Sequence, residues 1–373
     1  MRLFEKVTIG GQVAANRMVL PPLTRSRADE DGMPNALMAL YYGQRSGAGL
    51  VVSEGTVVSP QGVAYPRVPG IYTAEQAEAW RPIVAGIHDG GALAYCQLWH
   101  VGRQSHSSVQ PDGLPPLAPS AVPVQNFQYR SLNGRIPYEV PRELTVEQIH
   151  EIIQQYATAA ANARAAGFDG VELHGANGYL IDQFLNTSAN RRTDHFGGSI
   201  ENRTRFLALL LEALADVLPL ERVGVRLSPS SDWMDMLDDD KRGVYSAAIQ
   251  VLNHAGVGYL HLVEPAIAGS TSTQRAHDAV ESAFYARQFH DVVIVTGDHT
   301  LASAEQLLAD GVADMVGFGR LFIANPDLPE RFRRGARLNE VRAKGFYSGG
   351  VEGYTDYPTL EADDLTPVKD VHP

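Results

Sequence analysis

The chain has 373 residues, of which 44% are hydrophobic and 20% charged, and its 31 Lys and Arg against 43 Asp and Glu give a formal net charge of −12. This acidic balance excludes a general nucleic-acid binder, which needs a basic surface, and the hydrophobic content excludes a largely disordered chain. The single cysteine, Cys96, excludes an intrachain disulfide framework and a multi-cysteine zinc or iron–sulfur site.

No segment of the sequence has the pattern of a secretion signal or a membrane span. The first residues, MRLFEKVTIGGQ, lack the apolar core of a signal peptide. No window reaches the roughly 18 consecutive apolar residues that cross a bilayer. We therefore expect a cytoplasmic protein that has neither a membrane nor a nucleic acid as its partner.

Eight short apolar runs, rich in Val, Ile and Leu, recur along the chain and predict buried strands. They begin at Arg17, Gly49, Ala92, Asp169, Val223, Gly258, Asp291 and Asp314. The segments between the runs show helical periodicity, and two of them open with capping-box signatures, at Thr73–Gln76 and Thr145–Gln148. Strands of continuous apolar character that alternate with helices predict a parallel sheet covered by helices.

Eight strand–helix units fit a single (β/α)8 TIM barrel of the α/β class, and we expect an N-terminal hairpin in front of it. A doubly wound open sheet is the alternative, and it would place a glycine-rich phosphate loop after the first strand. That position reads PPLTR, from Pro21, and no G-x-G-x-x-G motif follows any predicted strand. The barrel is therefore favoured, and we expect residues 1–360 to form it as one domain without a separate dinucleotide-binding unit.

Two segments depart from the barrel pattern. The connection after the third predicted strand, residues 104–143, is long and rich in Pro, Gly, Ser and Asn, so we expect an insert that forms a lid or is disordered. The last segment, residues 361–373, is acidic and poor in apolar side chains. We expect it to be a mobile tail.

Polar, aromatic or glycine residues stand where the predicted strands end, which is where barrels of this kind carry their chemistry. They are Thr24, Gly55, Gln97, Trp99, His174, Asn177, Tyr179, Arg226, Gly297, Gly319 and Arg320. Gly297, Gly319 and Arg320 predict a phosphate site, because glycine lets backbone N–H groups approach an anion and arginine adds charge-assisted hydrogen bonds. The alternative is that the glycines only serve turns and the arginine is a surface cation.

The residues at these strand ends lie in motifs that resemble the Old Yellow Enzyme family of FMN-dependent ene-reductases, whose bacterial members include reductases of pentaerythritol tetranitrate and morphinone. The matching stretches are NRMVLPPLTRSRA from Asn16, YYGQRSGAGLVVSEGT from Tyr41, QLWHVGR from Gln97, FDGVELHGANGYLIDQFLN from Phe168, RRTDHFGGSIENRTRF from Arg191, VRLSP from Val225, GFGRLFIANPDLPER from Gly317 and FYSGGVEGYTDYP from Phe346. They follow the family order from about residue 2 to 360.

The resemblance implies noncovalent FMN that is reduced by NADPH or NADH and reoxidised by an alkene conjugated to a carbonyl or nitro group. It implies that Thr24 binds near the flavin O4 and N5, Gln97 at the pyrimidine edge and Arg226 near N1 and O2. Further implied FMN contacts are Pro22, Leu23, Gly55, Gly297, Gly319 and Arg320. The alternative functions are a flavin-bearing protein that binds ligands such as phenols without turnover, and an iron–sulfur flavoenzyme, against which the single cysteine argues.

The run HGANGY carries the catalytic residues that the resemblance implies. His174 and Asn177 donate hydrogen bonds to the substrate oxygen, and Tyr179 supplies a proton. The implied pocket walls are Trp99, Tyr65 and Tyr347, although an aromatic such as Tyr65 is equally at home in a core. No metal is expected, because no H-x-H follows the first predicted strand.

Four side chains carry structural expectations of their own. Glu172 and His174 alternate with apolar neighbours and should point into the barrel, where we expect Glu172 to pair with Arg226. Cys96 should face the helices, and Asp298 must turn away from the predicted phosphate site or repel its ligand. The expected partners are activated alkenes and phenolic inhibitors, and the protein is expected to be a monomer or a homodimer.

Overall fold

The computed structural model describes residues 1–131, 134–265, 267–268, 271–272, 281–347 and 349–360. The predicted tail, residues 361–373, lies outside the described residues. None of the described helices is both long and apolar enough to span a membrane.

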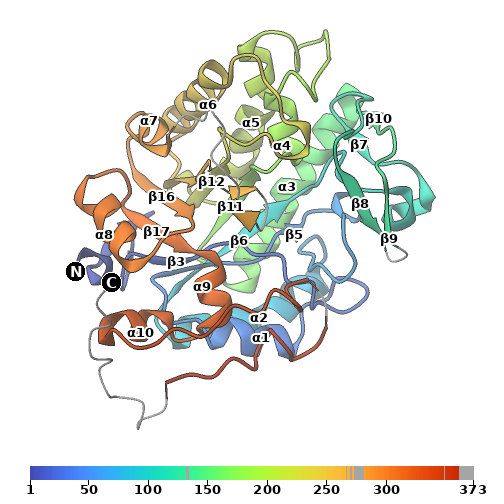
Figure 1. The fold of residues 1–373 in the computed structure, drawn as a ribbon. Helices are drawn as coiled ribbons and strands as arrows, with labels where there is room; N and C mark the ends of the chain where they lie inside the picture. The colour runs from blue at the N-terminus through green and yellow to red at the C-terminus, as the bar shows by residue number, and fades with distance from the viewer. Residues whose placement is uncertain (132–133, 266, 269–270, 273–280, 348, 361–373) are drawn as a thin grey trace.

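Eight parallel strands close into a barrel (Figure 1). They are β3 (Met18–Leu20), β4 (Leu50–Val52), β6 (Leu93–Trp99), β11 (Gly170–Gly175), β12 (Val223–Leu227), β13 (Tyr259–Val263), β16 (Val292–Gly297) and β17 (Met315–Phe318). Each predicted apolar run supplies one of these strands. The barrel closes because β6 pairs with both β4 and β11. The predicted (β/α)8 fold is confirmed, and the open sheet is excluded.

Helices surround the barrel. The α-helices are α1 (Ala36–Gly43), α2 (Ala74–Asp89), α3 (Val146–Ala166), α4 (Leu180–Leu185), α5 (Ile200–Ala215), α6 (Lys241–Ala255), α7 (Ser282–Ala286), α8 (Leu301–Ala309), α9 (Gly319–Ala324) and α10 (Leu328–Arg334). Short 3₁₀ helices are η1 (Arg2–Phe4), η2 (Pro60–Gly62), η3 (Ser107–Val109), η4 (Pro111–Gly113), η5 (Leu220–Arg222) and η6 (Trp233–Asp235). Both predicted capping boxes form, at the starts of α2 and α3, and satisfy backbone N–H groups that a helix start leaves unpaired.

The predicted N-terminal hairpin closes the lower end of the barrel, which is the end where the strands begin. It consists of β1 (Val7–Ile9) and β2 (Gln12–Ala14), which pair antiparallel. Ile9 and Ala14 pack with inward-facing strand residues, among them Tyr95 and Tyr259, in one buried apolar cluster. The lower half of the barrel is thus filled, which leaves the opposite end, where the strands finish, for a ligand.

The outward faces of the strands pack against the helices in the main core. Cys96 is fully buried in this layer, as its alternation with Gln97 predicts. Burial raises the pKa of its thiol to about 12, so the thiol is neutral at pH 7. Cys96 is therefore a packing residue.

The described residues of the insert, 104–131 and 134–143, are folded, whereas the sequence left open that the insert is disordered. It contains β7 (Leu117–Ala118), β8 (Gln128–Ser131), β9 (Gly134–Pro137) and β10 (Arg142–Glu143), with β8 and β9 paired as an antiparallel hairpin. The Tyr129 hydroxyl donates to the Ala64 carbonyl oxygen at 2.6 Å. This contact ties the hairpin to the loop that follows β5 (Thr56–Val57). A further short pair, β14 (Ile267–Ala268) and β15 (Thr271–Ser272), follows β13.

Three fully buried arginines fasten the last described segment to the start of the barrel. Arg25 donates from Nε to the Phe346 carbonyl oxygen at 3.0 Å and from Nη2 to that of Gly353 at 2.7 Å. Arg27 and Arg45 donate to further carbonyl oxygens of the same segment. These bonds satisfy buried carbonyl groups that belong to no helix or strand, so the segment has a defined place beside the strand ends.

Candidate active site

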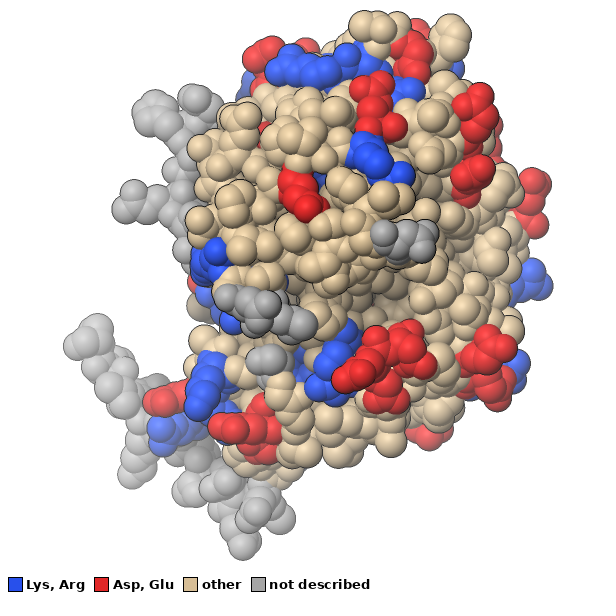
Figure 2. Space-filling view, turned by 90° about the vertical axis from the view of Figure 1, so that its right-hand side faces the viewer, with Lys and Arg blue, Asp and Glu red and all other residues tan. Residues whose placement is uncertain are grey.

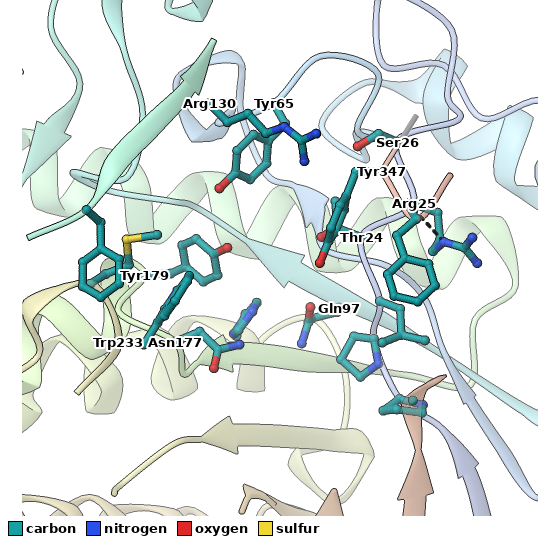
Figure 3. A pocket seen from close by; sticks show the side chains of 18 of the residues that line it. Thr24, Arg25, Ser26, Tyr65, Gln97, Arg130, Asn177, Tyr179, Trp233 and Tyr347 are labelled. Atoms are coloured by element: carbon teal, nitrogen blue, oxygen red, sulfur yellow. Dashed lines mark hydrogen bonds between the residues drawn. The ribbon is translucent and has the colours of Figure 1, made fainter. Parts of the chain in front are cut away.

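A cavity of about 990 Å³ opens at the carboxyl ends of the barrel strands. The predicted site residues that line it are Pro22, Leu23, Thr24, Tyr65, Gln97, His174, Asn177, Tyr179, Arg226, Gly297, Gly319, Arg320 and Tyr347. Figure 3 shows Tyr65, Tyr179 and Tyr347 turned toward a common space, with Gln97 and Asn177 beneath it. In Figure 2 the surface is hollowed near the middle of the face shown, and the walls of the hollow are mostly uncharged.

Two residues expected at this site lie outside the cavity wall. Trp99 is 1% exposed, and its ring packs edge-on against Tyr179 at 5.0 Å and beside Tyr65 at 6.5 Å. Gly55 makes room for it, because a Cβ there would lie 2.6 Å from Trp99 Cε3. Trp99 therefore supports two wall tyrosines from behind, which corrects the expectation that it lines the pocket, and Gly55 serves this packing.

The HGANGY loop is held in an unusual conformation by its neighbours. Asn177 has a left-handed φ of +58°, a region that Asn tolerates better than most residues. Its N–H donates to Ser228 Oγ at 2.8 Å, and its carbonyl oxygen accepts from Gln104 Nε2 at 2.7 Å. At Gly178, with φ +75°, a Cβ would lie 2.8 Å from the same Gln104 nitrogen. The loop therefore needs glycine there and presents Asn177 to the cavity.

A second set of bonds fixes this loop from below. Asp182 accepts from the Gly178 N–H at 2.8 Å and from the Tyr245 hydroxyl. Gln183 donates from Nε2 to the Gly178 carbonyl oxygen at 2.7 Å. Both backbone polar groups of Gly178, its N–H and its carbonyl oxygen, are thus hydrogen-bonded, so the backbone that leads to Tyr179 is held in place.

Burial sets the protonation of His174 and Tyr179. It lowers the pKa of His174 well below the usual value, and the positive Arg226 adds to that effect, so the imidazole is neutral at pH 7. Burial, followed by the neighbouring Tyr65, raises the pKa of Tyr179 well above 10. Tyr179 therefore carries its proton at pH 7. The two rings lie 4.8 Å apart, edge to face.

The expected direct pair between Glu172 and Arg226 does not form. Glu172 instead accepts from Gln97 Nε2 at 2.8 Å and from the Tyr259 hydroxyl at 3.0 Å, and lies 2.8 Å from His261 Nδ1. The alternation of residues in the sequence places Glu172 and Arg226 on the same face of the sheet. It does not show that Tyr259 and His261 of β13 bind the Glu172 carboxylate instead of Arg226. Arg226 Nε is buried and has no hydrogen-bond partner among the described residues.

At the predicted phosphate site, Arg320 forms an ion pair with Asp298, the carboxylate that the sequence analysis expected to repel a phosphate. Arg320 Nη2 lies 2.7 Å from Asp298 Oδ1, and the arginine side chain is 32% exposed. The two charges offset one another, so Asp298 does not face a ligand uncompensated. Gly297 is closely packed, because a Cβ there would lie 2.7 Å from Glu264 Cγ.

The charged side chains in the mostly uncharged cavity wall are arginines, although the chain is acidic. Its lining includes Arg25, Arg67, Arg130, Arg135, Arg226 and Arg320, and no Asp or Glu occurs among the described lining residues. Arg130 and Arg135 face one another across the β8–β9 hairpin. Such a wall favours anionic ligands. Sequence reasoning missed this pair, and the available signal was the Asn133-Gly134 turn sequence, which is typical of a hairpin.

Aromatic residues from two loops complete the wall, and sequence reasoning missed Phe127 and Trp233 among them. Phe127 of the insert packs on Trp233 of the loop after β12, with ring centroids 4.7 Å apart. Tyr65 stacks on Tyr129 at 6.4 Å. No periodic pattern marks such residues, because their position depends on loops that meet only in the folded chain.

These residues fit FMN. Arg226 Nε and His174 Nδ1 are buried polar atoms without a partner among the described residues, as expected where a ligand supplies the missing contact. Gln97 carries both a donor and an acceptor, which suits the pyrimidine edge of a flavin. Arg320, with the glycines at 297 and 319, suits a phosphate.

Comparison with known proteins agrees with this assignment. Residues 2–339 match the NADH:flavin oxidoreductase / NADH oxidase family. The chain is 44% identical to 12-oxophytodienoate reductase 1 of Oryza sativa over 354 residues, 94% of this chain and 91% of the relative. Morphinone reductase shares 41% identity with a TM-score of 0.90 over 97% of both chains. The Old Yellow Enzyme homologue of Zymomonas mobilis shares 39% with a TM-score of 0.92, over 96% of this chain and 100% of that one.

The predicted family and cofactors are thereby confirmed, and the alternative of a non-catalytic flavin carrier is set aside. The resemblance covers the whole barrel and both ends of the cavity. The chain belongs to the NADH:flavin oxidoreductase / NADH oxidase family, as an Old Yellow Enzyme-type oxidoreductase that uses FMN with a nicotinamide nucleotide as its reductant.

Proposed function

We propose that the chain reduces the C=C bond of alkenes conjugated to a carbonyl or nitro group. The observation that carries this proposal is that one cavity is lined both by His174, Asn177 and Tyr179, from β11 and the loop after it, and by Thr24, Gln97 and Arg226, from other strands and their ends. Two hydrogen-bond donors and one acid from a single short segment suit a substrate that gains negative charge on an oxygen and then needs a proton.

Bound FMN would take a hydride from NADPH or NADH and deliver it to the β-carbon of the alkene. Thr24, Gln97 and Arg226, with the adjoining backbone of Pro22 and Leu23, would hold the ring. The fixed guanidinium of Arg226 beside the ring would favour the extra negative charge of the reduced flavin. Arg320, beside Gly297 and Gly319, would hold the phosphate.

His174 and Asn177 would bind the carbonyl or nitro oxygen of the substrate. A neutral imidazole offers one N–H, and the Asn177 amide offers two more, so both can donate to an oxygen whose negative charge grows during the reaction. Because the loop and its partners fix Asn177, little rearrangement is needed as the charge develops. Phenolic inhibitors would bind to the same donors through their oxygen.

Tyr179 would give its proton to the α-carbon. Its raised pKa keeps the hydroxyl protonated at pH 7, so the acid is in the required form before the substrate arrives. Trp99 behind the wall and His174 beside it limit the movement of the ring. This restraint would favour transfer in one geometry.

The substrate would be flat and largely apolar outside its activating group. Tyr65 and Tyr347 supply aromatic walls of the cavity, and Phe127 with Trp233 extends them. The relatives are named as reductases of morphinone and 12-oxophytodienoate. By likeness to them, we propose conjugated ketones as the first substrates to try.

One experiment tests the proposal directly. Purified protein should be yellow and should release FMN on denaturation. In an anaerobic stopped-flow instrument, NADPH or NADH should bleach the flavin, and cyclohexenone should restore its colour. Protein that stays colourless with added FMN, or reduced protein that no activated alkene reoxidises, would contradict the proposal.

A further inference from the structure

A buried hydrogen-bond network crosses the barrel below the cavity, and none of the roles proposed above uses it as a whole. The trans-barrel network consists of Gln97, Glu172, Tyr259, His261 and Thr296. Beyond the three contacts of Glu172 already described, His261 Nε2 lies 2.7 Å from Thr296 Oγ1. The two ends of the network, Gln97 and Thr296, line the cavity, while its centre is fully buried.

Two glycines make room for this network. A Cβ at Gly224 would lie 2.0 Å from Tyr259 Cζ, and a Cβ at Gly317 would lie 2.0 Å from Thr296 Oγ1. Tyr259 can therefore reach from β13 across β12 to Glu172 on β11 only because position 224 has no side chain. The backbone is arranged so that the network forms.

Burial and the neighbouring groups determine the charge states of Glu172 and His261 in the network. Burial raises the pKa of Glu172, but His261, Arg226 and Gln97 together outweigh this effect and hold its pKa below the usual value. Burial lowers the pKa of His261, so it is neutral and donates from Nδ1 to the carboxylate while Nε2 accepts from the threonine hydroxyl. Glu172 is thus an ionised carboxylate in the barrel interior.

An ionised carboxylate only accepts hydrogen bonds, and this has a consequence for Gln97. The amide of Gln97 must turn its NH2 group toward Glu172 Oε1, 2.8 Å away. Its carbonyl oxygen and second N–H are then left in one fixed arrangement. The two residues are direct neighbours in the register of β6 and β11, so this geometry is built into the sheet.

The same carboxylate offsets the charge of Arg226 from a distance. The groups that face Glu172 are Gln97 on β6, Arg226 on β12, and Tyr259 and His261 on β13, with His174 farther along its own strand. Arg226 is the one cation of this set at pH 7. Because no direct ion pair binds Arg226 to Glu172, its guanidinium stays available to the cavity.

We infer that Glu172 is a positioning residue of the FMN site, which orients the Gln97 amide and offsets the charge of Arg226. It thereby keeps the reduction potential of bound FMN lower than Arg226 alone would make it. The inference rests on the proposed placement of FMN over Gln97 and Arg226. Glu172 itself touches neither cofactor nor substrate.

The decisive variant is Glu172→Gln, which removes one negative charge at nearly constant shape. Reduced FMN carries more negative charge than oxidised FMN, so the variant should bind the reduced form more tightly relative to the oxidised form. The midpoint potential, measured by anaerobic dye titration, should rise. A tenfold change in that ratio of affinities corresponds to about 30 mV for a two-electron couple.

Asp169→Asn is the matched control. Asp169 directly precedes β11 and also loses one charge, but it accepts from the Ala94 N–H at 2.8 Å and from Gln12 at the closed end of the barrel. This variant should be less stable to heat and should leave the FMN potential unchanged. An equal shift in both variants would overturn the inference, because net charge alone would then explain it.

His261→Asn provides a second test that does not depend on the folding of Glu172→Gln. Without the imidazole, the pKa of Glu172 rises, so the carboxyl takes up a proton at higher pH than in the parent protein. The potential of the variant should exceed that of the parent by an amount that grows as the pH falls. Protein that binds FMN with parental potentials in both variants refutes this inference alone, whereas parent protein that binds no FMN refutes the proposed function.

Discussion

The floor and the rim of the cavity are built in different ways. Floor residues such as Gln97 and Arg226 come from barrel strands and are buried, and Gln97 is hydrogen-bonded to Glu172. Rim residues come from the β8–β9 hairpin and the last described segment, where Arg130 and Arg135 are exposed and Tyr347 is 39% exposed. A rigid floor suits steps that need fixed geometry, and an exposed rim suits the admission and choice of ligands.

The largest effect should come from the proposed acid, Tyr179. Tyr179→Phe should slow reoxidation of the flavin by cyclohexenone by roughly 10²–10⁴, the range typical of general acid catalysis. FMN content and flavin reduction by NADPH should change little, because reduction needs no proton donor. Stopped-flow measurement of each half-reaction checks this, with Tyr65→Phe as the control that removes a different wall hydroxyl. Equal slowing of both half-reactions would make Tyr179 a packing residue.

The oxygen-binding donors should follow. His174→Ala and Asn177→Gly should each slow reoxidation by an enone by about 10²–10³, the usual cost of one lost donor to a developing oxyanion. Glycine is chosen at 177 because it adopts the left-handed φ of +58° without strain. Phenol affinity, measured by the change in flavin absorbance, should fall in parallel. Variants that fold and keep both properties would show that these side chains are structural.

A smaller effect is expected where the floor meets solvent, at Arg320. Arg320→Ala should weaken FMN binding by about 1.5 kcal/mol, roughly tenfold, since the charge-assisted bond to phosphate is lost at a partly exposed site. Asp298→Asn should have the opposite sign, because it removes the carboxylate that lies 2.7 Å from the arginine. Titration of apoprotein with FMN measures both. Unchanged affinity in Arg320→Ala would assign the phosphate to other groups.

The smallest effect should come from the rim. Arg130→Ala and Arg135→Ala should each raise the KM for NADPH about two- to fivefold, the range of an exposed charge pair, and should affect NADH less because it has one phosphate fewer. The difference should shrink at high ionic strength. Steady-state kinetics at two salt concentrations decide this. Equal effects on the two nucleotides would remove the rim from coenzyme choice.

The sequence predicts the floor better than the rim for a physical reason. A continuous apolar run in the sequence predicts each barrel strand, and the residues at the carboxyl end of a barrel strand lie at the mouth of the barrel. Arg130 lies in β8 of the insert and Trp233 in the loop after β12, and contacts between distant segments decide where these two parts of the chain lie. The Asn133-Gly134 sequence indicates a hairpin, but no local pattern shows that the hairpin borders the cavity. The same limit explains Trp99, whose ring turns away from the cavity to fill the space left at Gly55.

The fastening of the last described segment by Arg25 bears on how the cavity comes into being during synthesis. The Nε of Arg25 bonds a carbonyl group 321 positions later in the chain. Arg25 therefore leaves the ribosome long before Phe346 is synthesised, and contacts between residues so far apart in the chain form late and slowly. A nascent chain that stops before Phe346 lacks one side of the pocket, so we expect cofactor capture to wait until Phe346 and Tyr347 have left the ribosome.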